Sequence, residues 1–307
     1  MNLNLNLKDF PPEDFRFANV SFFTPRKHLV NTYRPKILVH ASKCPEAGPF
    51  LLLVIPSVDF HVKDRLAVRR TWASVLYGGA WPGDSRNFSS VVKLVFFFGK
   101  SWNFASIRDE SRRYNDVVQA DFVDSYRNLS LKMAAVLQWS TEHCAGARHV
   151  MKVDEDTFVD LGLVVDLLSE VSRRRHRYVL GYRHPRDHPP AVRFGKWRVS
   201  NLTYPFRRFP RYVTGHSYVI SGDAVKALAW AYWHMPLVPN EDAYVTGILA
   251  TSVGVQGLAC SRFAHAVDED DRCELVAGRS VTQTLFKPPS EFYRMWERLA
   301  FGCECPR

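Results

Sequence analysis

The sequence contains no hydrophobic run long enough to cross a membrane. Its longest apolar runs, Phe50 to Ile55 and Leu94 to Phe98, are far shorter than the roughly eighteen residues that a spanning helix needs. At its start Asn and Leu alternate before Lys8 and Asp9, which is not the basic and then apolar layout of a secretory signal. If the protein is lumenal, we therefore expect the chain to be truncated before its anchor or to be an incomplete gene product.

Cysteine pairs with the spacing of a zinc ribbon are also missing, so a metal-cysteine site is not expected. The six cysteines are even in number and scattered over the whole length. Three N-glycosylation triplets begin at Asn87, Asn128 and Asn201. Together these features favour an oxidising compartment, in which most of the cysteines would be paired. Cys303 and Cys305 are too close in sequence to bond each other easily, so each should have a distant partner.

Acidic residues are fewer than basic ones, and the formal charge is +10. Such an excess can mark a surface that binds nucleic acid. However, the densest basic run, residues 173–177, follows an amphipathic stretch and is better explained as the solvated end of a helix. No recognised nucleic-acid-binding pattern accompanies it, so we expect no nucleic-acid partner.

The 307 residues, 46% of them hydrophobic, can form one large domain or two small ones around a proper core. Residues 1–48 contain several prolines and no sustained periodicity, which predicts an extended stem. Residues 49–307 would then form the compact domain. Apolar runs in it predict buried strands, and 3.6-residue periodicity predicts helices between them. The strands are expected at 50–55, 91–98, 117–122 and 149–153, and the helices at 64–74 and 128–144. This alternation predicts a mainly parallel α/β sheet.

Three consecutive carboxylates, Asp154, Glu155 and Asp156, follow the last of these strands directly. Ligands of open α/β sheets bind beyond the carboxyl ends of the strands. Asp154 and Asp156 point the same way because side chains alternate along an extended chain. They could therefore hold a divalent cation that clamps a diphosphate. Taken alone, the tripeptide is explained about equally well as a solvated turn that caps a helix.

The context of this acidic turn resembles a known family. The segment from Cys144 to Val159 looks like the Asp-x-Asp region of the β-1,3-galactosyltransferase and β-1,3-N-acetylglucosaminyltransferase family. Four more blocks match in the family's order, at Arg65–Trp72, Asp121–Lys132, Tyr218–Asp223 and Glu241–Val245. The resemblance extends from about Phe50 to Trp296, nearly the whole compact domain.

The resemblance implies a nucleotide-sugar-binding glycosyltransferase fold of the GT-A type, with one mainly parallel Rossmann-like sheet. It also implies a UDP-sugar donor held with Mn²⁺. Asp156 is the first choice for metal ligand, and Asp154 would lie near the ribose or share the metal. Glu155 replaces a family Asp but keeps the carboxylate at the donor site.

Arg65 and Arg69 are four residues apart, so they share one helix face and could reach the nucleotide together. The alternative is that both arginines pair with acidic residues of the protein. Trp72 in the same block is better explained as a core residue. Lys132 could lie near the phosphates or be solvated.

An inverting transfer needs one base to take the proton of the acceptor hydroxyl as that hydroxyl attacks the anomeric carbon. By resemblance the base lies in the acidic pair Glu241 and Asp242, and we assign it to Asp242. Glu241, His216 and Tyr218 are expected near the acceptor. The alternative for the acidic pair is capping of a helix that begins near Ala243, a role that Asn240 could also fill.

Two departures from the family pattern affect the site. Gly215-His216-Ser217 stands where many relatives have Gly-x-Gly, so a side chain replaces bare backbone near the sugars. Leu285 stands where many relatives have a His that would be a second metal ligand. Metal binding would then be weaker, or His265 would substitute from another loop.

The sequence thus predicts an inverting enzyme that transfers galactose from UDP-galactose to a glycan on lipid or protein in β-1,3 linkage. Transfer of N-acetylglucosamine from UDP-GlcNAc is the nearest alternative, and a catalytically dead sugar-binding partner protein is a more distant one. Family resemblance implies a type II membrane protein of the Golgi lumen.

Overall fold

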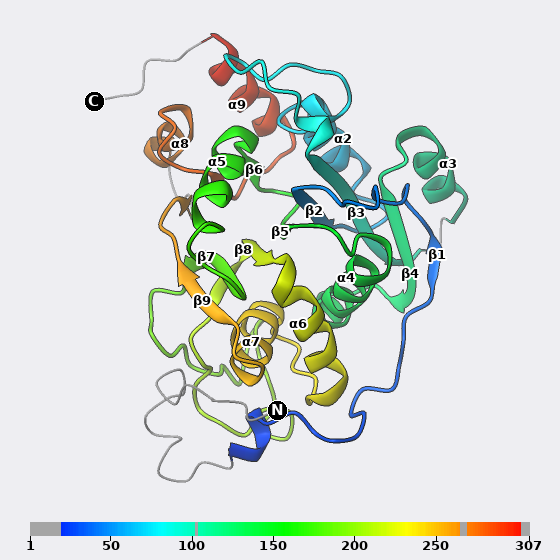
Figure 1. Ribbon diagram of the computed structural model, residues 1–307, viewed down its shortest axis with the longest axis vertical. Coiled ribbons are helices and arrows are strands. Elements are labelled where there is room, and N and C mark those ends of the chain that lie inside the picture. The colour runs from blue at the N-terminus through cyan, green and yellow to red at the C-terminus, as the bar shows by residue number, and fades with distance from the viewer. Residues whose placement is uncertain (1–19, 102–103, 265–268, 302–307) are drawn as a thin grey trace.

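The computed structural model describes residues 20–101, 104–264 and 269–301. Within these residues an eight-stranded sheet runs through the molecule from β1 at one edge to β9 at the other (Figure 1). The strands lie in the order β1 (Ile37–Val39), β4 (Val117–Val123), β3 (Val92–Lys100), β2 (Leu51–Pro56), β5 (His149–Val153), β8 (Val213–Ser221), β7 (Tyr178–Arg183) and β9 (Gln256–Ala259).

Strands β4, β3, β2 and β5 run parallel to one another, and they are the four strands expected from the apolar runs. Every residue of β2 and of β5 is buried. Such continuous burial is typical of parallel strands with helices on both faces. The expected α/β fold with one mainly parallel sheet is therefore confirmed.

The direction of the chain reverses beside β5. Strand β8 is antiparallel to it, with Val153 opposite Ser217 and Lys152 opposite Tyr218. The first residues of β8 consequently lie beside the carboxyl end of β5, where the acidic turn begins. This reversal brings a further segment of the chain to the predicted ligand-binding edge.

Helices cover both faces of the sheet. Alternate residues of β2 pack into two different hydrophobic clusters, because successive side chains point to opposite faces. Helices α4 (Leu129–His143) and α6 (Gly222–His234) cover one face and lie side by side (Figure 1). Helices α2 (Val62–Arg70), α5 (Leu161–Val171) and α9 (Ser290–Phe301) cover the other. The two expected helices are confirmed, although α2 ends four residues earlier than expected.

Shorter elements complete the described chain. The π-helix η6 (Ala243–Leu249) follows the acidic pair, and a small second sheet contains β10 (Phe263–Ala264), β11 (Thr282–Gln283) and β6 (Phe158–Val159). The remaining helical elements are η2 (Val20–Phe23), η3 (Ser74–Leu76), η4 (Phe88–Ser90), α3 (Phe104–Tyr114), η5 (Tyr126–Asn128), α7 (Ala250–Ser252) and α8 (Glu269–Val276).

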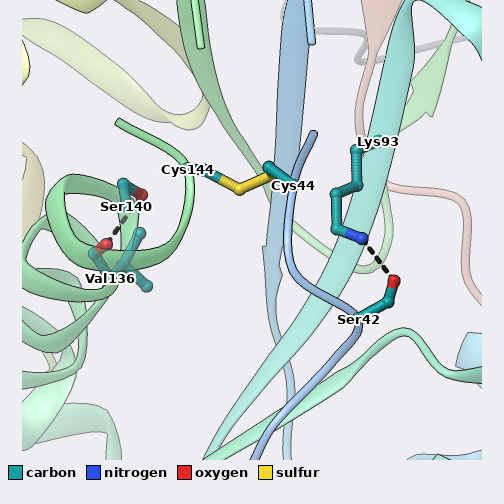
Figure 2. The surroundings of a disulfide bond; sticks show 6 residues. All are labelled: Ser42, Cys44, Lys93, Val136, Ser140 and Cys144. Atoms are coloured by element: carbon teal, nitrogen blue, oxygen red, sulfur yellow. Dashed lines mark hydrogen bonds between the residues drawn. A yellow bond between two sulfur atoms is a disulfide. The ribbon is translucent and has the colours of Figure 1, made fainter. Parts of the chain in front are cut away.

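The segment before residue 49 is part of the compact domain over its described residues. Strand β1 pairs with β4, and Phe23 packs in the core. A disulfide joins Cys44 to Cys144, 100 residues later, at the end of α4 (Figure 2). The boundary expected at residue 48, between an extended stem and the domain, therefore does not separate residues 20–48 from the fold.

Cys273 is also disulfide-bonded, whereas Cys260 is a free thiol. The expectations for Cys303 and Cys305 concern residues outside the described part of the chain. In that part, no helix combines the length and the apolar character needed to cross a membrane.

Candidate active site

A cavity of about 900 Å³ opens at the carboxyl end of β5. Its walls come from the turn after β5, the start of β8, the segment between β7 and β8, and the residues just before η6. Ligands of open α/β sheets bind at this edge. Five residues predicted from the sequence line the cavity: Asp154, Asp156, His216, Glu241 and Asp242.

Lys152 connects the two acidic groups of the cavity. Its Nζ lies 2.6 Å from Asp154 Oδ1 and 3.6 Å from Glu241 Oε2, and it also donates to the carbonyl oxygen of Gly215. Burial alone would lower the pKa of Lys152, but the charges of Asp154 and Glu241 raise this pKa above its usual value. Lys152 therefore stays charged and fixes the acidic turn against the acidic pair.

Glu241 and Asp242 differ in access to the cavity. Glu241 is buried and accepts a hydrogen bond of 2.5 Å from the Tyr218 hydroxyl. Burial raises the pKa of Glu241 to about 7 despite the nearby Lys152, and the charge of Asp242 adds to this effect. Asp242 is half-buried, and burial raises its pKa too. Its Oδ1 accepts a hydrogen bond of 2.8 Å from the Ala243 backbone N–H at the start of η6.

Gly215 leaves room for this acidic pair. A Cβ at position 215 would lie 3.3 Å from Asp242 Cβ and 3.5 Å from Glu241 Oε2. The first of these distances is tighter than normal packing allows, so a side chain here would push Asp242 aside. The glycine of the family pattern thus has a physical reason in this chain.

The two residues after Gly215 point in different directions. His216 lines the cavity, and its Nδ1 lies 3.0 Å from Thr214 Oγ1. Ser217 is fully buried, and its Oγ lies 2.9 Å from Thr282 Oγ1 of β11. The side chain added by the departure Gly-x-Gly to Gly-x-Ser therefore enters the core and leaves the cavity unchanged. Tyr218, which was expected at the acceptor, lies beneath the cavity and holds Glu241.

Asp154 and Asp156 offer carboxylate oxygens to the cavity, but both are paired with lysines. Lys287 Nζ lies 3.0 Å from Asp156 Oδ2. Among the described residues, no group of three or more His, Cys, Asp or Glu is arranged for a metal ion. Two carboxylates still suit Mn²⁺ when phosphate oxygens of a substrate and water complete its ligands. The residues fit a cation once Lys287, whose side chain is 60% exposed, moves off Asp156.

Leu285 stands beside this carboxylate pair. It lines the cavity, is half-exposed and has a φ of 69°, in the left-handed region that few residues with side chains adopt. The next residue, Phe286, donates its N–H to the Asp156 carbonyl oxygen over 2.9 Å. The position expected for a ligating histidine is therefore close to Asp156 and holds an apolar side chain. His265, the proposed substitute, lies outside the described residues.

The central carboxylate of the acidic turn points elsewhere. Glu155 Oε2 accepts a hydrogen bond of 2.8 Å from Ser57 Oγ, and the carboxylate also contacts His61 just before α2. Burial raises the pKa of Glu155. Glu155 thus joins the ends of β5 and β2 and is not among the residues that line the cavity.

Arg65 and Arg69 share one face of α2, as expected, but this face is buried against other acidic residues. Arg65 donates to both oxygens of Glu110 of α3, at 2.8 and 2.6 Å. Arg69 donates to Glu110 and, through two bonds of 2.8 Å, to Asp116. The structure therefore places both guanidinium groups in an internal ion-pair network and not in the cavity.

Lys132 and Trp72 are buried as well. Lys132 Nζ lies 2.8 Å from Asp124 Oδ1 and donates to the Ser57 carbonyl oxygen over 2.7 Å. Burial lowers the pKa of Lys132. Trp72 is fully buried in the cluster beneath α2. Neither residue lines the cavity.

Sequence reasoning missed two lysines at the centre of the site, Lys152 and Lys287. Lys152 did carry a signal, because it is a lysine within a fully buried strand, and such a residue needs a partner. Lys287 carried none, since it reaches Asp156 from a segment 131 positions further along the chain.

This chain is similar to known galactosyltransferases. A family model described as Galactosyltransferase matches residues 63–261. Beta-1,3-galactosyltransferase 1 of Homo sapiens is 28% identical over 294 residues, which cover 94% of this chain and 84% of that protein. Beta-1,3-galactosyltransferase 5 of Gorilla gorilla gorilla is 32% identical over 206 residues, which cover 66% of this chain and 65% of that protein.

Among solved structures, the galactosyltransferase LgtC in complex with donor and acceptor sugar analogs has a TM-score of 0.41 and 11% identity. The match covers 82% of this chain and 98% of LgtC. A TM-score this low adds nothing to the assignment, and the fold class rests on the sheet itself.

Proposed function

Because the chain belongs to the galactosyltransferase family, we propose that it transfers galactose from UDP-galactose to a glycan acceptor in β-1,3 linkage with inversion of configuration. The observation that carries this proposal is the cavity at the carboxyl end of β5. It brings Asp154 and Asp156 together with the acidic pair Glu241 and Asp242. The first pair suits the donor, and the second suits a hydroxyl group that must lose a proton.

Asp242 is proposed as the base. It faces the cavity and is half-buried, whereas Glu241 is held by the Tyr218 hydroxyl. A carboxylate within hydrogen-bond reach of the acceptor hydroxyl takes its proton as the oxygen attacks the anomeric carbon. The bond between this carbon and the UDP oxygen breaks, and UDP leaves with the electron pair. Attack opposite the leaving group converts the α-linked donor sugar into a β-linked product.

Glu241 and Tyr218 act as positioning residues in this proposal. The Tyr218 hydroxyl fixes one carboxylate oxygen of Glu241, and Lys152 lies near the other. Because burial favours the neutral form of Glu241, with a pKa of about 7, the pair need not carry two negative charges. The two carboxyl groups can then share one proton as a coupled pair.

The donor diphosphate is proposed to lie beside Asp154 and Asp156. Mn²⁺ bound there would neutralise the charge that builds on the leaving UDP. Asp156 is the primary ligand because Lys287, its exposed partner, can move aside. Asp154, held by the buried Lys152, shares the cation or contacts the ribose.

We further propose that the enzyme works in the Golgi lumen, as a type II membrane protein in its full-length form. The described disulfides support an oxidising compartment. Of the three glycosylation triplets, Asn87 and Asn201 are exposed. Asn128 donates its side-chain amide to the Val123 carbonyl oxygen.

The proposal is tested by offering the purified protein UDP-galactose and UDP-N-acetylglucosamine separately, with a panel of glycan acceptors. Galactose transfer with a new β-1,3 linkage, identified by NMR of the product, is expected. Transfer of N-acetylglucosamine alone would replace the donor assignment. Failure to transfer or hydrolyse either donor would favour a sugar-binding protein without activity.

A further inference from the structure

The segment between β7 and β8, residues 184–212, is strongly basic. It contains seven Lys or Arg residues and one acidic residue, Asp187, and therefore has a net charge of +6 out of +10 for the whole protein. This segment forms one wall of the cavity. Its composition therefore bears directly on what the cavity binds.

Three of these arginines support the segment itself. Arg193 donates to the backbone carbonyl oxygens of Val199, Tyr204 and Phe206. Arg208 donates to the His188 carbonyl oxygen over 2.9 Å, and Arg211 pairs with Asp187 at 2.7 Å. These contacts are enough to explain the three arginines, and no bound ligand is needed.

The basic rim, defined as Arg127, Arg186, Lys196 and Arg198, has no such explanation. All four residues are exposed and line the cavity, and none pairs with a carboxylate in the described ranges 20–101, 104–264 and 269–301. Four like charges around one opening repel one another. They also create a positive potential that attracts and orients an anion.

Two residues of the basic rim, Lys196 and Arg198, lie near the acidic pair. Asn240, next to Glu241, donates its side-chain amide to the Trp197 carbonyl oxygen over 2.9 Å. Trp197 stands between Lys196 and Arg198 and is 60% exposed. The ammonium group of Lys196 lies 4.7 Å from the centre of the Tyr126 ring. Exposed aromatic rings beside polar groups are typical of walls that bind small polar ligands.

We propose that the acceptor is an acidic glycan, with a carboxylate or sulfate group close to the sugar that is extended, and that the basic rim binds this group. The inference rests on the proposed function, because it assigns the acceptor side of the same cavity. Guanidinium groups suit it because they bind carboxylate and sulfate oxygens through paired hydrogen bonds. Asp242 would then act on a hydroxyl group of the neighbouring sugar.

The donor diphosphate is the competing anion for these cations. Its proposed place is at Asp154 and Asp156, where a bound metal ion would balance its charge. Lys196 and Arg198 instead flank Trp197, whose carbonyl oxygen accepts the hydrogen bond of Asn240 beside the acidic pair. A test must therefore measure acceptor binding and UDP binding separately.

The experiment titrates the protein, with UDP present, with a disaccharide that contains one uronate and one sulfate ester. Calorimetry gives its affinity and that of the desulfated and carboxyl-reduced forms. We expect binding at least about tenfold tighter for the fully charged disaccharide than for one lacking both groups, with the difference shrinking as salt rises. Whichever single removal costs more affinity identifies the group bound.

The double variant Lys196→Gln/Arg198→Gln should lose at least about tenfold in affinity for the charged disaccharide. The matched double variant Arg173→Gln/Arg174→Gln removes two exposed charges at the end of α5, away from the cavity, and should bind as wild type does. Equal affinity for charged and neutral disaccharides, or a charge preference that survives in Lys196→Gln/Arg198→Gln, would overturn the proposal. A loss of UDP affinity alone in Lys196→Gln/Arg198→Gln would also overturn it.

These binding measurements do not depend on catalysis. A protein that binds the charged disaccharide selectively but transfers no sugar would contradict the proposed function and leave the acidic ligand in place. A protein that transfers galactose equally well to charged and neutral acceptors would support the proposed function and contradict the acidic acceptor.

Discussion

At the residue scale, Asp156 has two rival partners, the ammonium group of Lys287 and the proposed cation. The distance of 3.0 Å between Lys287 Nζ and Asp156 Oδ2 leaves no space for a metal ion between them. Cation binding at Asp156 Oδ2 must therefore displace Lys287, which costs the ion pair. Such exposed pairs are weak, worth about 1 kcal/mol or less, so the displacement lowers cation affinity only moderately.

Leu285 offers a direct test of the cation site. It lines the cavity beside Asp156, and its φ of 69° suits His better than Leu. We expect Leu285→His to add an imidazole ligand and to raise Mn²⁺ affinity about tenfold or more in the presence of UDP. Electron paramagnetic resonance of free Mn²⁺ during a titration measures this affinity without relying on activity.

The matched control is Leu285→Gln, which is polar and of similar size but lacks the imidazole. Its affinity for Mn²⁺ should stay close to that of wild type. If Leu285→His and Leu285→Gln bind Mn²⁺ equally, position 285 does not face the cation and the proposed metal site at Asp156 is misplaced.

The family resemblance was enough to predict that Asp154, Asp156, Glu241 and Asp242 lie together, and all four line one cavity. The direction in which a helix face points was not predictable in this way. The spacing of Arg65 and Arg69 correctly predicts a shared face, but only packing decides that the face meets Glu110 and Asp116. The resemblance also implied that Tyr218 and Glu155 contact ligands, whereas their side chains bind Glu241 and Ser57 of the protein.

At the element scale, the ion-pair network of Arg65, Arg69, Glu110 and Asp116 joins α2 to α3 and to the start of β4. We expect Glu110→Gln to destabilise the fold by about 3 kcal/mol, because it leaves two buried arginines short of a partner. Urea unfolding at pH 7 measures this loss. UDP affinity of the folded variant should be unchanged, since neither arginine lines the cavity.

The effect of Glu110→Gln should depend on pH. Burial alone would raise the pKa of Glu110, but hydrogen bonds and charge from Arg65 and Arg69 lower it below its usual 4.5. A carboxylate whose pKa is lower in the folded protein than in the unfolded chain stabilises the fold fully at pH values above the pKa of the unfolded chain. This stabilisation disappears as the pH falls through the pKa of the folded protein. The difference in free energy of unfolding between wild type and Glu110→Gln should therefore become smaller below about pH 4.5. If Glu110→Gln lost UDP affinity without losing stability, Arg65 would have to be assigned to the nucleotide site.

Strand and helix positions in the parallel part of the sheet could be predicted because apolar runs and helical periodicity are local signals. The reversal at β8 could not, since strand direction depends on how distant segments pair. This reversal brings Gly215 and His216 to the cavity. The π-helix η6 after Asp242 was expected only as a helix beginning near Ala243, because sequence periodicity does not separate the two forms.

At the scale of the whole molecule, the disulfide between Cys44 and Cys144 ties the segment before β2 to the end of α4 across 100 residues (Figure 2). A bond that closes so long a loop restricts the unfolded chain strongly. We expect the double variant Cys44→Ser/Cys144→Ser to lose about 2–4 kcal/mol in the free energy of unfolding. Chemical denaturation of wild type and variant gives the difference.

The free cysteine provides the control for this measurement. Cys260 has no disulfide partner, so Cys260→Ser should change stability by less than about 1 kcal/mol. If removing Cys44 and Cys144 costs no more than this, the bond does not hold the segment before residue 49 to the domain.

Asp242 is proposed to remove the proton of the acceptor hydroxyl. The most direct test measures turnover and UDP affinity of Asp242→Asn beside wild type. Asn can still accept the hydrogen bond from the Ala243 N–H, so the fold and UDP affinity should be kept, while turnover falls about a hundredfold or more. Asp156→Asn should instead weaken donor binding. Near-normal turnover of Asp242→Asn would show that Asp242 is not the base.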